Sequence, residues 1–315
     1  MTVCSIPDMS HFTPFSLVGL IALADLDMVA RRTAFGGTAA WLDTLVLCPG
    51  LHLQHQAANF NNGEFPACAA MTTGYVFRVE NPATVFYLQS VSETGKLTSI
   101  SVSKAASQPQ EGAHLLYLAA GLLASTLYFL GSLGDWWALS YLFALILVRF
   151  VNTALIRTQA RVDWHGQSEP GQLGDLFILL SYDRWVRIRG EVDDLKAVTS
   201  GRWLRRAAPF ENFMSGCATL LAYAAPTLAA NATVEGQVNI AILLMGNAAA
   251  LATANYLTNS LRMKERVLQA HGPRKAYERR SILASELIAE SGREDWAVAM
   301  GLTPGDTRSR NSVTM

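Results

Sequence analysis

The sequence predicts a mainly α-helical, polytopic membrane protein with four transmembrane helices in two hairpins, plus a small mixed α/β cytosolic segment between the hairpins. Two observations predict this fold. The 315 residues separate into long charge-free apolar runs and polar, charged stretches, although the mean hydropathy is only +0.21. Basic residues also gather beside those runs as they do on the cytosolic side of membrane helices. A soluble chain spreads its apolar residues at helical or strand periods instead.

Four apolar runs approach the roughly 20 residues that a helix needs to cross a bilayer. They cover residues 114–133, 136–156, 213–231 and 237–257. The last two runs are rich in alanine, so a buried hairpin within a soluble domain is the alternative for them.

A shorter apolar run at 15–24 is interrupted by Asp25 and Asp27. About ten residues at roughly 1.5 Å each do not reach across a hydrocarbon core of roughly 30 Å. We therefore expect a buried or membrane-surface helix in this region. An additional transmembrane helix at 15–30 stays open as the alternative, and it would move the N-terminal region to the other side of the membrane.

The charges around the four runs predict an orientation. The turns at 134–135 and 232–236 contain no lysine or arginine, whereas the segment between the hairpins and the C-terminal tail are rich in both. Both termini are therefore predicted to be cytosolic. The predicted parts are a cytosolic N-terminal region (1–110), a first hairpin (111–157), a basic cytosolic mini-domain (158–212), a second hairpin (213–259) and a basic helical tail (260–315).

The soluble parts carry local patterns. Residues 175–181 and 184–190 have strand length and flank Tyr182-Asp183, which predicts a β-hairpin with one buried and one basic face. A short helix is expected at 191–201 and a longer one at 274–291, where Gly201 and Gly292 would end them. The small, polar residues of 92–112 predict a linker into the first membrane helix.

Few residues suggest chemistry. Cys48, His52 and His55, with Cys68 further on, bring thiol and imidazole groups close together, and zinc prefers such ligands. The spacing matches no standard zinc pattern, so packing is the favoured interpretation. No nucleophile–base set is evident, and we expect no catalytic residues and no cofactor.

Polar residues inside the apolar runs form a second group of candidates. Arg149 and Asn152 lie in the second run, and Asn239, Asn247 and Asn255 recur every eight residues in the fourth. Charges inside a membrane usually face a bundle interior or a water-filled cavity. Hydrogen bonding between helices is the simpler interpretation for the asparagines.

Two stretches, CPGLHLQHQAANF (48–60) and the segment 163–204 that begins DWHGQSEPGQ, resemble a group of uncharacterised multi-pass integral membrane proteins of filamentous fungi. The resemblance extends over most of the chain. It implies a fungal multi-pass protein, and it transfers no activity and no site residues.

The favoured function is a non-catalytic scaffold, adaptor or subunit that anchors a cytosolic domain. Its partners would be the bilayer and another membrane or cytosolic protein, or a second copy of itself. The formal net charge is zero, which excludes the basic excess typical of nucleic-acid binding. One alternative is a small membrane enzyme acting on a lipophilic substrate through His52, His55, Asp163 and His165. The other is an oligomeric pore or carrier lined by Arg149 and the asparagines.

Overall fold

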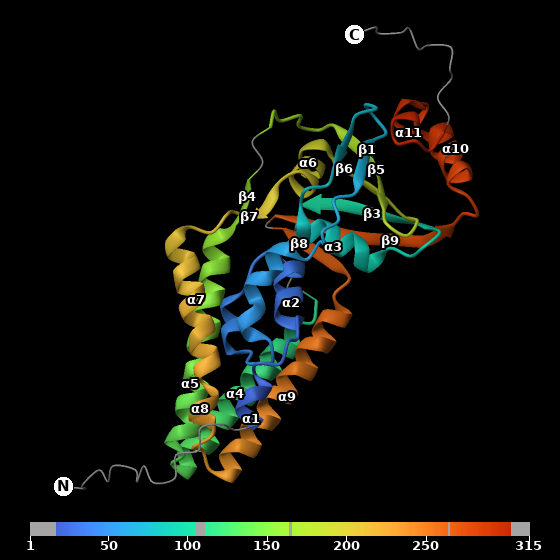
Figure 1. The fold of residues 1–315 in the computed structure, drawn as a ribbon. Coiled ribbons are helices and arrows are strands. Elements are labelled where there is room, and N and C mark those ends of the chain that lie inside the picture. Colours follow the sequence, from blue (N-terminus) through green and yellow to red (C-terminus); the bar gives the residue numbers. More distant parts are fainter. Residues whose placement is uncertain (1–16, 105–110, 164–165, 264, 304–315) are drawn as a thin grey trace, which may run out of the picture. The chain divides into compact units, whose positions relative to one another are not determined.

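The chain folds into two compact units, each assembled from three separate stretches. The computed structural model describes residues 17–104, 111–163, 166–263 and 265–303 (Figure 1). The helical unit comprises Met1–Ala58, Ser107–Arg161 and Leu204–Thr258. The sheet unit comprises Asn59–Ala106, Val162–Trp203 and Asn259–Met315. The sequence-based division into consecutive segments did not anticipate this interleaving.

Three helices of the helical unit are long and apolar enough to cross a membrane: α4 (Ala113–Leu133), α5 (Trp136–Gln159) and α9 (Val234–Leu257). With 21 to 24 residues each, they measure roughly 32–36 Å and exceed the roughly 30 Å hydrocarbon core. Gly134, at φ 70°, ends α4 in the left-handed conformation. Asp135 then caps α5 by accepting a hydrogen bond from the Ala138 N–H at 3.0 Å.

The prediction of four transmembrane helices in two hairpins is wrong. The expected helix at 213–231 is instead α7 (Pro209–Ala224) followed by the four-residue α8 (Pro226–Ala229). Pro226 has no N–H for a helical hydrogen bond, and its ring crowds the preceding turn, so the long helix stops there. The 16 residues of α7 span roughly 24 Å, which is less than the hydrocarbon core. The seven-stranded mixed sheet of the sheet unit also makes the protein less purely helical than predicted.

The segment from Leu17 to Ala58 belongs to the helical unit. It contains α1 (Leu17–Ile21), α2 (Met28–Gly36) and two 3-10 helices, η2 (Trp41–Leu45) and η3 (Leu51–Asn59). α1 packs so closely on α8 that a Cβ at Gly19 would lie 2.7 Å from Pro226 Cα. α2 lies beside α9, where the Asn255 side-chain amide donates to Met28 O at 2.9 Å. Residues 17–36 therefore run along the unit beside the long helices.

The helical unit has two distinguishable ends. At the distal end, Asp135 accepts hydrogen bonds from the Thr233 N–H (2.8 Å) and hydroxyl (2.7 Å), which joins the start of α5 to the start of α9. At the connecting end, Glu211 of α7 accepts from Thr158 and Gln159, the last residues of α5. The chain passes into the sheet unit from the connecting end. The core between the ends is apolar and includes Leu123, Tyr141, Leu142, Leu145 and Leu243.

The sheet unit contains a seven-stranded sheet in the order β2-β1-β5-β6-β3-β9-β8. Its strands are β1 (Ala67–Ala70), β2 (Val76–Arg78), β3 (Lys96–Lys104), β5 (Leu173–Leu180), β6 (Arg184–Glu191), β8 (Ser260–Met263) and β9 (Arg266–Ala276). Neighbouring strands are antiparallel, except that β3 and β6 are parallel. Two further strands, β4 (Ala160–Asp163) and β7 (Arg202–Leu204), form a separate ribbon.

Several local predictions for the sheet unit are confirmed. β5 and β6 form the expected hairpin, and its turn holds Tyr182 and Asp183 at φ 61° and 53°. The short helix is α6 (Val192–Thr199), and the tail helix is α10 (Arg280–Ser291), which is shorter than predicted. The expected linker at 92–112 was wrong, because residues 96–104 form β3, with Leu97, Ile100 and Val102 buried.

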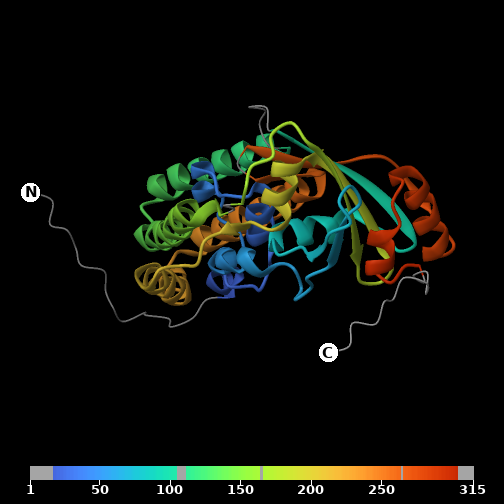
Figure 2. The same cartoon turned by 90° about the horizontal axis from the view of Figure 1, so that it is seen from above.

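Helices cover both faces of this sheet. α10 and α11 (Asp295–Ala299) pack Leu283, Leu287 and Trp296 onto Phe177 and Trp185 of one face. α3 (Pro82–Val91) and α6 lie on the opposite face, as the two views in Figures 1 and 2 show. They are joined by a 2.6 Å hydrogen bond from the Thr84 hydroxyl to Val198 O.

Candidate binding groove

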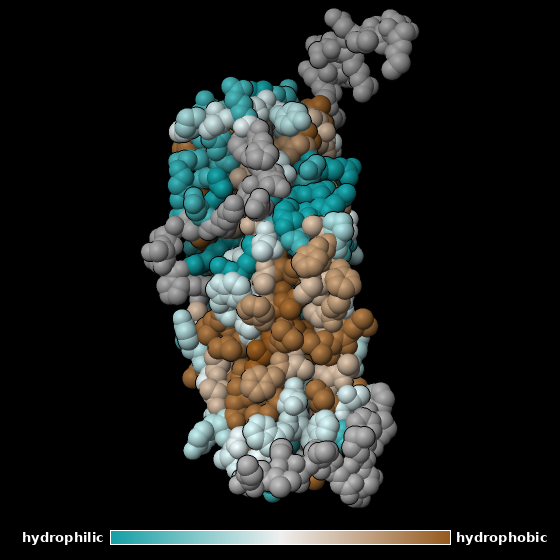
Figure 3. All heavy atoms as spheres, turned by 90° about the vertical axis from the view of Figure 1, so that its left-hand side faces the viewer, coloured by the Kyte–Doolittle hydropathy of each residue, from teal (hydrophilic) through white to brown (hydrophobic). Residues whose placement is uncertain are grey.

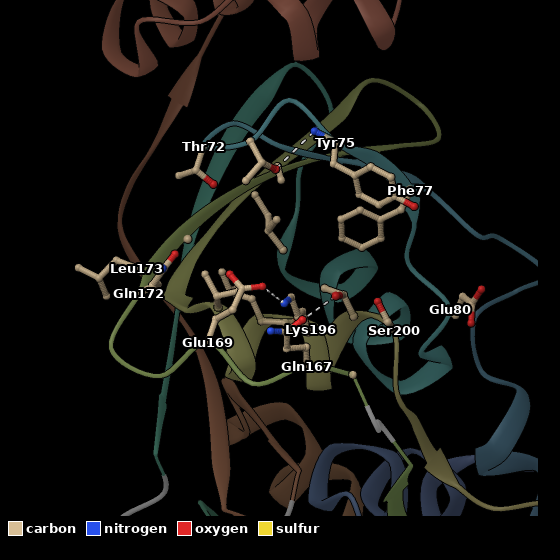
Figure 4. A pocket seen from close by; sticks show the side chains of 18 of the residues that line it. Thr72, Tyr75, Phe77, Glu80, Gln167, Glu169, Gln172, Leu173, Lys196 and Ser200 are labelled. Atoms are coloured by element: carbon tan, nitrogen blue, oxygen red, sulfur yellow. Dashed lines mark hydrogen bonds and ion pairs between the residues drawn. The ribbon is translucent and has the colours of Figure 1, made fainter.

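A groove of about 770 Å³ opens on the sheet face that carries α6. α6 packs against β3, β5 and β6, and it leaves the end of the sheet formed by β1 and β2 uncovered. Ala70 and Leu176 form the apolar floor there. The walls come from the β1–β2 hairpin, the loop before β5 and α6, and they include Thr72, Thr73, Tyr75, Phe77, Gln167, Glu169, Gln172, Leu173, Lys196 and Ser200 (Figure 4). A cavity of this size is typical of small-molecule or peptide side-chain pockets.

Two aromatic rings on the edge strand form one wall. Tyr75 and Phe77 stack with ring centroids 5.9 Å apart and an interplanar angle of 18°. Side chains alternate between sheet faces along a strand, so both rings lie on the groove side. Val76, between them, packs into the core on the other face with Phe177 and Trp296. Tyr75 keeps 68% of its surface exposed, which leaves its ring available to a ligand.

The hairpin that carries these rings is held in place from its tip. Arg293 donates to Thr72 O (3.4 Å) and Thr73 O (3.2 Å), and it forms a 2.5 Å ion pair with Asp295. This hydrogen-bonded pair keeps the pKa of the Asp295 carboxyl below its usual range. Gly74 adopts φ +81°, and a Cβ at that position would lie 2.1 Å from an Asp295 carboxylate oxygen. The turn therefore needs glycine both for its conformation and for the close approach of Asp295.

The opposite rim is fixed to the first turn of α6. Asp193 accepts hydrogen bonds from the Ser168 hydroxyl (2.5 Å) and from the Glu169 N–H (2.9 Å). These bonds lower the pKa of the Asp193 carboxyl. Glu169 in turn pairs with Lys196 at 2.6 Å, as Figure 4 shows at the bottom of the groove. The rim is thus organised before any ligand arrives, which reduces the entropy lost on binding.

The lining combines apolar, aromatic and polar side chains. It contains no histidine and no cysteine, and its one close ion pair, Lys196–Glu169, satisfies both charges. Arg78 and Glu80 add one charge of each sign at the edge, and the other polar or aromatic groups are rings, amides and hydroxyls, which supply apolar surface and neutral hydrogen bonds. The groove therefore suits a ligand surface that combines apolar and polar groups.

The candidate metal ligands do not converge. Cys48 is buried in an apolar cluster with Val29, Leu116 and Leu251. The His52 ring packs against Tyr223 with centroids 5.4 Å apart, and His55 Nδ1 lies 3.2 Å from His52 O. Cys68 lies in β1 of the sheet unit. Across residues 17–303, leaving out the undescribed gaps, no group of three His, Cys, Asp or Glu side chains is arranged to hold a metal ion.

The polar residues within the long apolar helices mostly bind the backbone of the N-terminal segment. Arg149 reaches Asp43 O through Nε (3.2 Å) and Nη2 (2.8 Å), and Gln54 Oε1 through Nη1 (2.7 Å). Asn152 donates to Leu51 O at 3.3 Å. These contacts satisfy carbonyl groups of a segment that has little regular helix, and such groups are costly to leave unpaired in an apolar environment.

The asparagines of α9 do not share one role. Asn255 donates to Met28 O, whereas Asn239 donates only to Glu235 O of its own helix. Asn247 is completely buried, and its amide makes no hydrogen bond to another described residue.

The remaining residues considered in the sequence are the acid–base candidates Asp163 and His165 and the arginines of the β5–β6 hairpin. His165 and the side chain of Asp163 lie outside the described residues. The expected basic face of the β5–β6 hairpin is covered by α10, because Arg187 is clamped between Asp175 (2.7 Å) and Glu290 (2.5 Å). Arg184 pairs with Glu64 at 3.8 Å. These arginines therefore hold the sheet unit together.

Sequence reasoning missed the groove. The sequence patterns did not single out Tyr75, Phe77, Gln167, Glu169 or Lys196. The alternation of Tyr75, Val76 and Phe77 was the available signal. No protein-family model, no curated protein and no solved structure matches this chain.

Proposed function

We propose that this protein is a non-catalytic membrane adaptor. The helical unit anchors it in a bilayer, and the sheet unit binds a partner protein through the groove on the cytosolic side. The observation that carries the proposal is the combination of three membrane-length helices with a preorganised groove whose lining has no catalytic set. Membership of the fungal multi-pass group stays a prediction.

The surface of the helical unit supports the membrane part of the proposal. Of the 29 exposed large hydrophobic side chains among the described residues, 23 belong to the helical unit. Figure 3 shows a broad brown area on this unit. The exposed large hydrophobic side chains of α5 and α7 include Phe143, Leu147, Phe150, Phe213 and Leu220. Exposed apolar surface on this scale is unusual in a soluble monomer and suits contact with lipid.

Charges support one orientation. No lysine or arginine occurs in 112–148 or in 207–261, whereas Arg157, Arg205 and Arg206 lie at the connecting end. Basic residues favour the cytosolic side, so we place the connecting end and the sheet unit there.

The N-terminal end of the described chain receives a different placement from the one predicted from the sequence. Tyr141, near the distal start of α5, donates its hydroxyl proton to Gly19 O at 3.2 Å. α1 therefore lies toward the distal end, and the chain reaches the connecting end through α2. This path favours a non-cytosolic side for the start of α1 and a cytosolic side for α10 and α11.

Gentle detergent extraction of the tagged full-length protein, with mass spectrometry of co-extracted proteins, tests the adaptor function. We expect one partner in near-equal amount. Tyr75→Ser should reduce that partner, because the exposed ring forms the groove wall. Tyr182→Ser, which removes an even more exposed tyrosine outside the groove, should not. A protein extracted alone in every preparation would contradict the proposal.

A further inference from the structure

The outer edge of β2 is an open hydrogen-bonding edge. On its inner side, Tyr75 O accepts from Ala70 N–H at 2.8 Å, and Val79 N–H donates to Pro66 O at 3.0 Å. Phe77 lies opposite Cys68 in the same register. Backbone groups alternate in direction along a strand, so the N–H and C=O of Val76 and Arg78 point away from β1. β2 is the terminal strand of the sheet order, and no described strand pairs with this outer side.

The groove lies directly beside this edge. Phe77 lies in the edge strand and Tyr75 directly precedes that strand, and both residues line the groove. An additional strand bonded to β2 would continue the pleat, so every second side chain would enter the groove next to these rings. The apolar floor at Ala70 and Leu176 suits apolar or aromatic side chains at those positions.

The charge beside the edge of β2 indicates which residue an added strand would have between the two side chains that enter the groove. Arg78 is exposed, and it forms no ion pair with another described residue. Arg78 borders the groove, but its Cβ lies on the sheet face opposite that of Phe77. Its guanidinium can therefore reach the side of an added strand that faces away from the groove. Opposite charges on neighbouring strands stabilise pairing. Glu80, the nearest acidic residue along the chain, follows the strand where the backbone turns to bond Thr199 O at 2.8 Å.

We propose that β2 binds an extended segment of the partner protein by strand addition. The segment has apolar or aromatic residues at two alternate positions, which fill the groove, and an acidic residue between them, which pairs with Arg78. This inference rests on the proposed adaptor function and names the kind of partner segment that the groove takes.

Two substitutions at Arg78 separate the contribution of its charge from that of its backbone N–H. Arg78→Glu reverses the charge and leaves the backbone edge intact. Arg78→Pro removes the outward N–H, which no inner hydrogen bond uses, and proline is tolerated at such edge positions. Arg279→Glu is the matched control, because Arg279 is an exposed arginine at the start of α10 and outside the groove lining.

The test is a selection of phage-displayed random linear peptides on the full-length protein in lipid nanodiscs. We expect enrichment of an apolar–acidic–apolar pattern. Arg78→Glu should weaken binding of those peptides by about fivefold, as expected for the loss of a cross-strand charge pair, and should shift a new selection toward lysine or arginine at the centre. Arg78→Pro should abolish enrichment, and Arg279→Glu should leave it unchanged.

Three results would overturn the inference. The peptides are not enriched over empty nanodiscs, or their enrichment survives both Arg78 substitutions. Alternatively, the protein self-associates and a second copy of the chain occupies the edge of β2. If the co-extracted partner stays at wild-type amount with Arg78→Glu and Arg78→Pro, strand addition is wrong while the adaptor function stands. If no partner is co-extracted with the wild-type protein, the adaptor function itself is refuted.

Discussion

Arg149 of α5 donates a 2.7 Å hydrogen bond to the side-chain oxygen of Gln54, a residue of the N-terminal segment almost a hundred positions earlier in the chain. Gln54 extends this chain of hydrogen bonds, because its amide nitrogen donates to the Thr33 hydroxyl at 3.1 Å. All three side chains are buried. Arg149 therefore anchors the N-terminal segment that packs among the helices.

Replacing Arg149 tests this anchoring role. In Arg149→Met, Asp43 O and Gln54 Oε1 lose their charged donor, and we expect a loss of about 1–3 kcal/mol in the free energy of unfolding for each acceptor left unpaired. Hydrogen exchange should also rise in residues 37–58. Thermal unfolding in detergent and exchange mass spectrometry measure both effects. Asn239→Leu, which removes only a bond within α9, is the control and should change stability by less than about 0.5 kcal/mol.

The arginines of β6 should differ in their importance. The Arg187 side chain is 10% exposed and binds Asp175 and Glu290, whereas Arg189 binds the same two acids with 54% of its side chain exposed. Arg187→Met should destabilise the sheet unit by about 1.5–3 kcal/mol, the range for hydrogen bonds to charged groups. Arg189→Ala should cost less than about 1 kcal/mol, because water screens exposed pairs. Equal losses in thermal unfolding would count against this assignment.

The carboxylate of Glu64 should make the sheet unit sensitive to acid. Burial alone raises the pKa of Glu64, but hydrogen bonds from Ser181 N–H (2.6 Å) and Gln89 (2.6 Å), with Arg184 nearby, lower it below its usual range. The stabilisation is present above the ordinary carboxyl pKa of about 4.3, and it is lost as pH falls through the lower folded pKa. The melting temperature of the wild type should thus fall more steeply with acid than that of Glu64→Gln. Glu80→Gln should keep the wild-type slope, and identical slopes in all three proteins would refute the prediction.

The proposed orientation predicts the sidedness of two exposed positions. Val234 is 79% exposed at the distal end, and Tyr182 is 82% exposed in the sheet unit. In a background without Cys4 and Cys217, Val234→Cys should react with a membrane-impermeant maleimide from the non-cytosolic side of sealed vesicles. Tyr182→Cys should react only after the vesicles are opened or inverted. Labelling of both cysteines from one side would show that the helical unit does not span the membrane in this way.

Local patterns predicted local elements well. The three long helices, the β5–β6 hairpin and α6 were predicted near their observed positions because each depends on a continuous apolar run or a short alternation. The prediction of a single helix at 213–231 was wrong because average hydropathy does not reveal the helix break at Pro226. β3 was not predicted because its serines, threonine and lysines make the segment polar on average, although Leu97, Ile100 and Val102 are buried.

Non-local features were beyond the sequence pattern. The sheet is assembled from three separate stretches of chain, and nothing in the sequence of β1 specifies its pairing with β5, about a hundred residues later. The groove exists because α6 stops short of those strands, and that depends on packing rather than on the residues that line it. The polar residues Arg149 and Asn152 were found because they interrupt a long apolar run, but their carbonyl partners could be identified only in the folded chain.

Photo-crosslinking at the groove wall tests the central proposal most directly. A photoreactive benzoylphenylalanine at Tyr75 of the full-length protein, irradiated in its native membrane, should form a covalent adduct with one partner protein. The same group at Tyr182, outside the groove, should not form that adduct. Absence of any protein adduct at Tyr75, or an identical set of adducts at both positions, would contradict a partner-binding groove and with it the adaptor function.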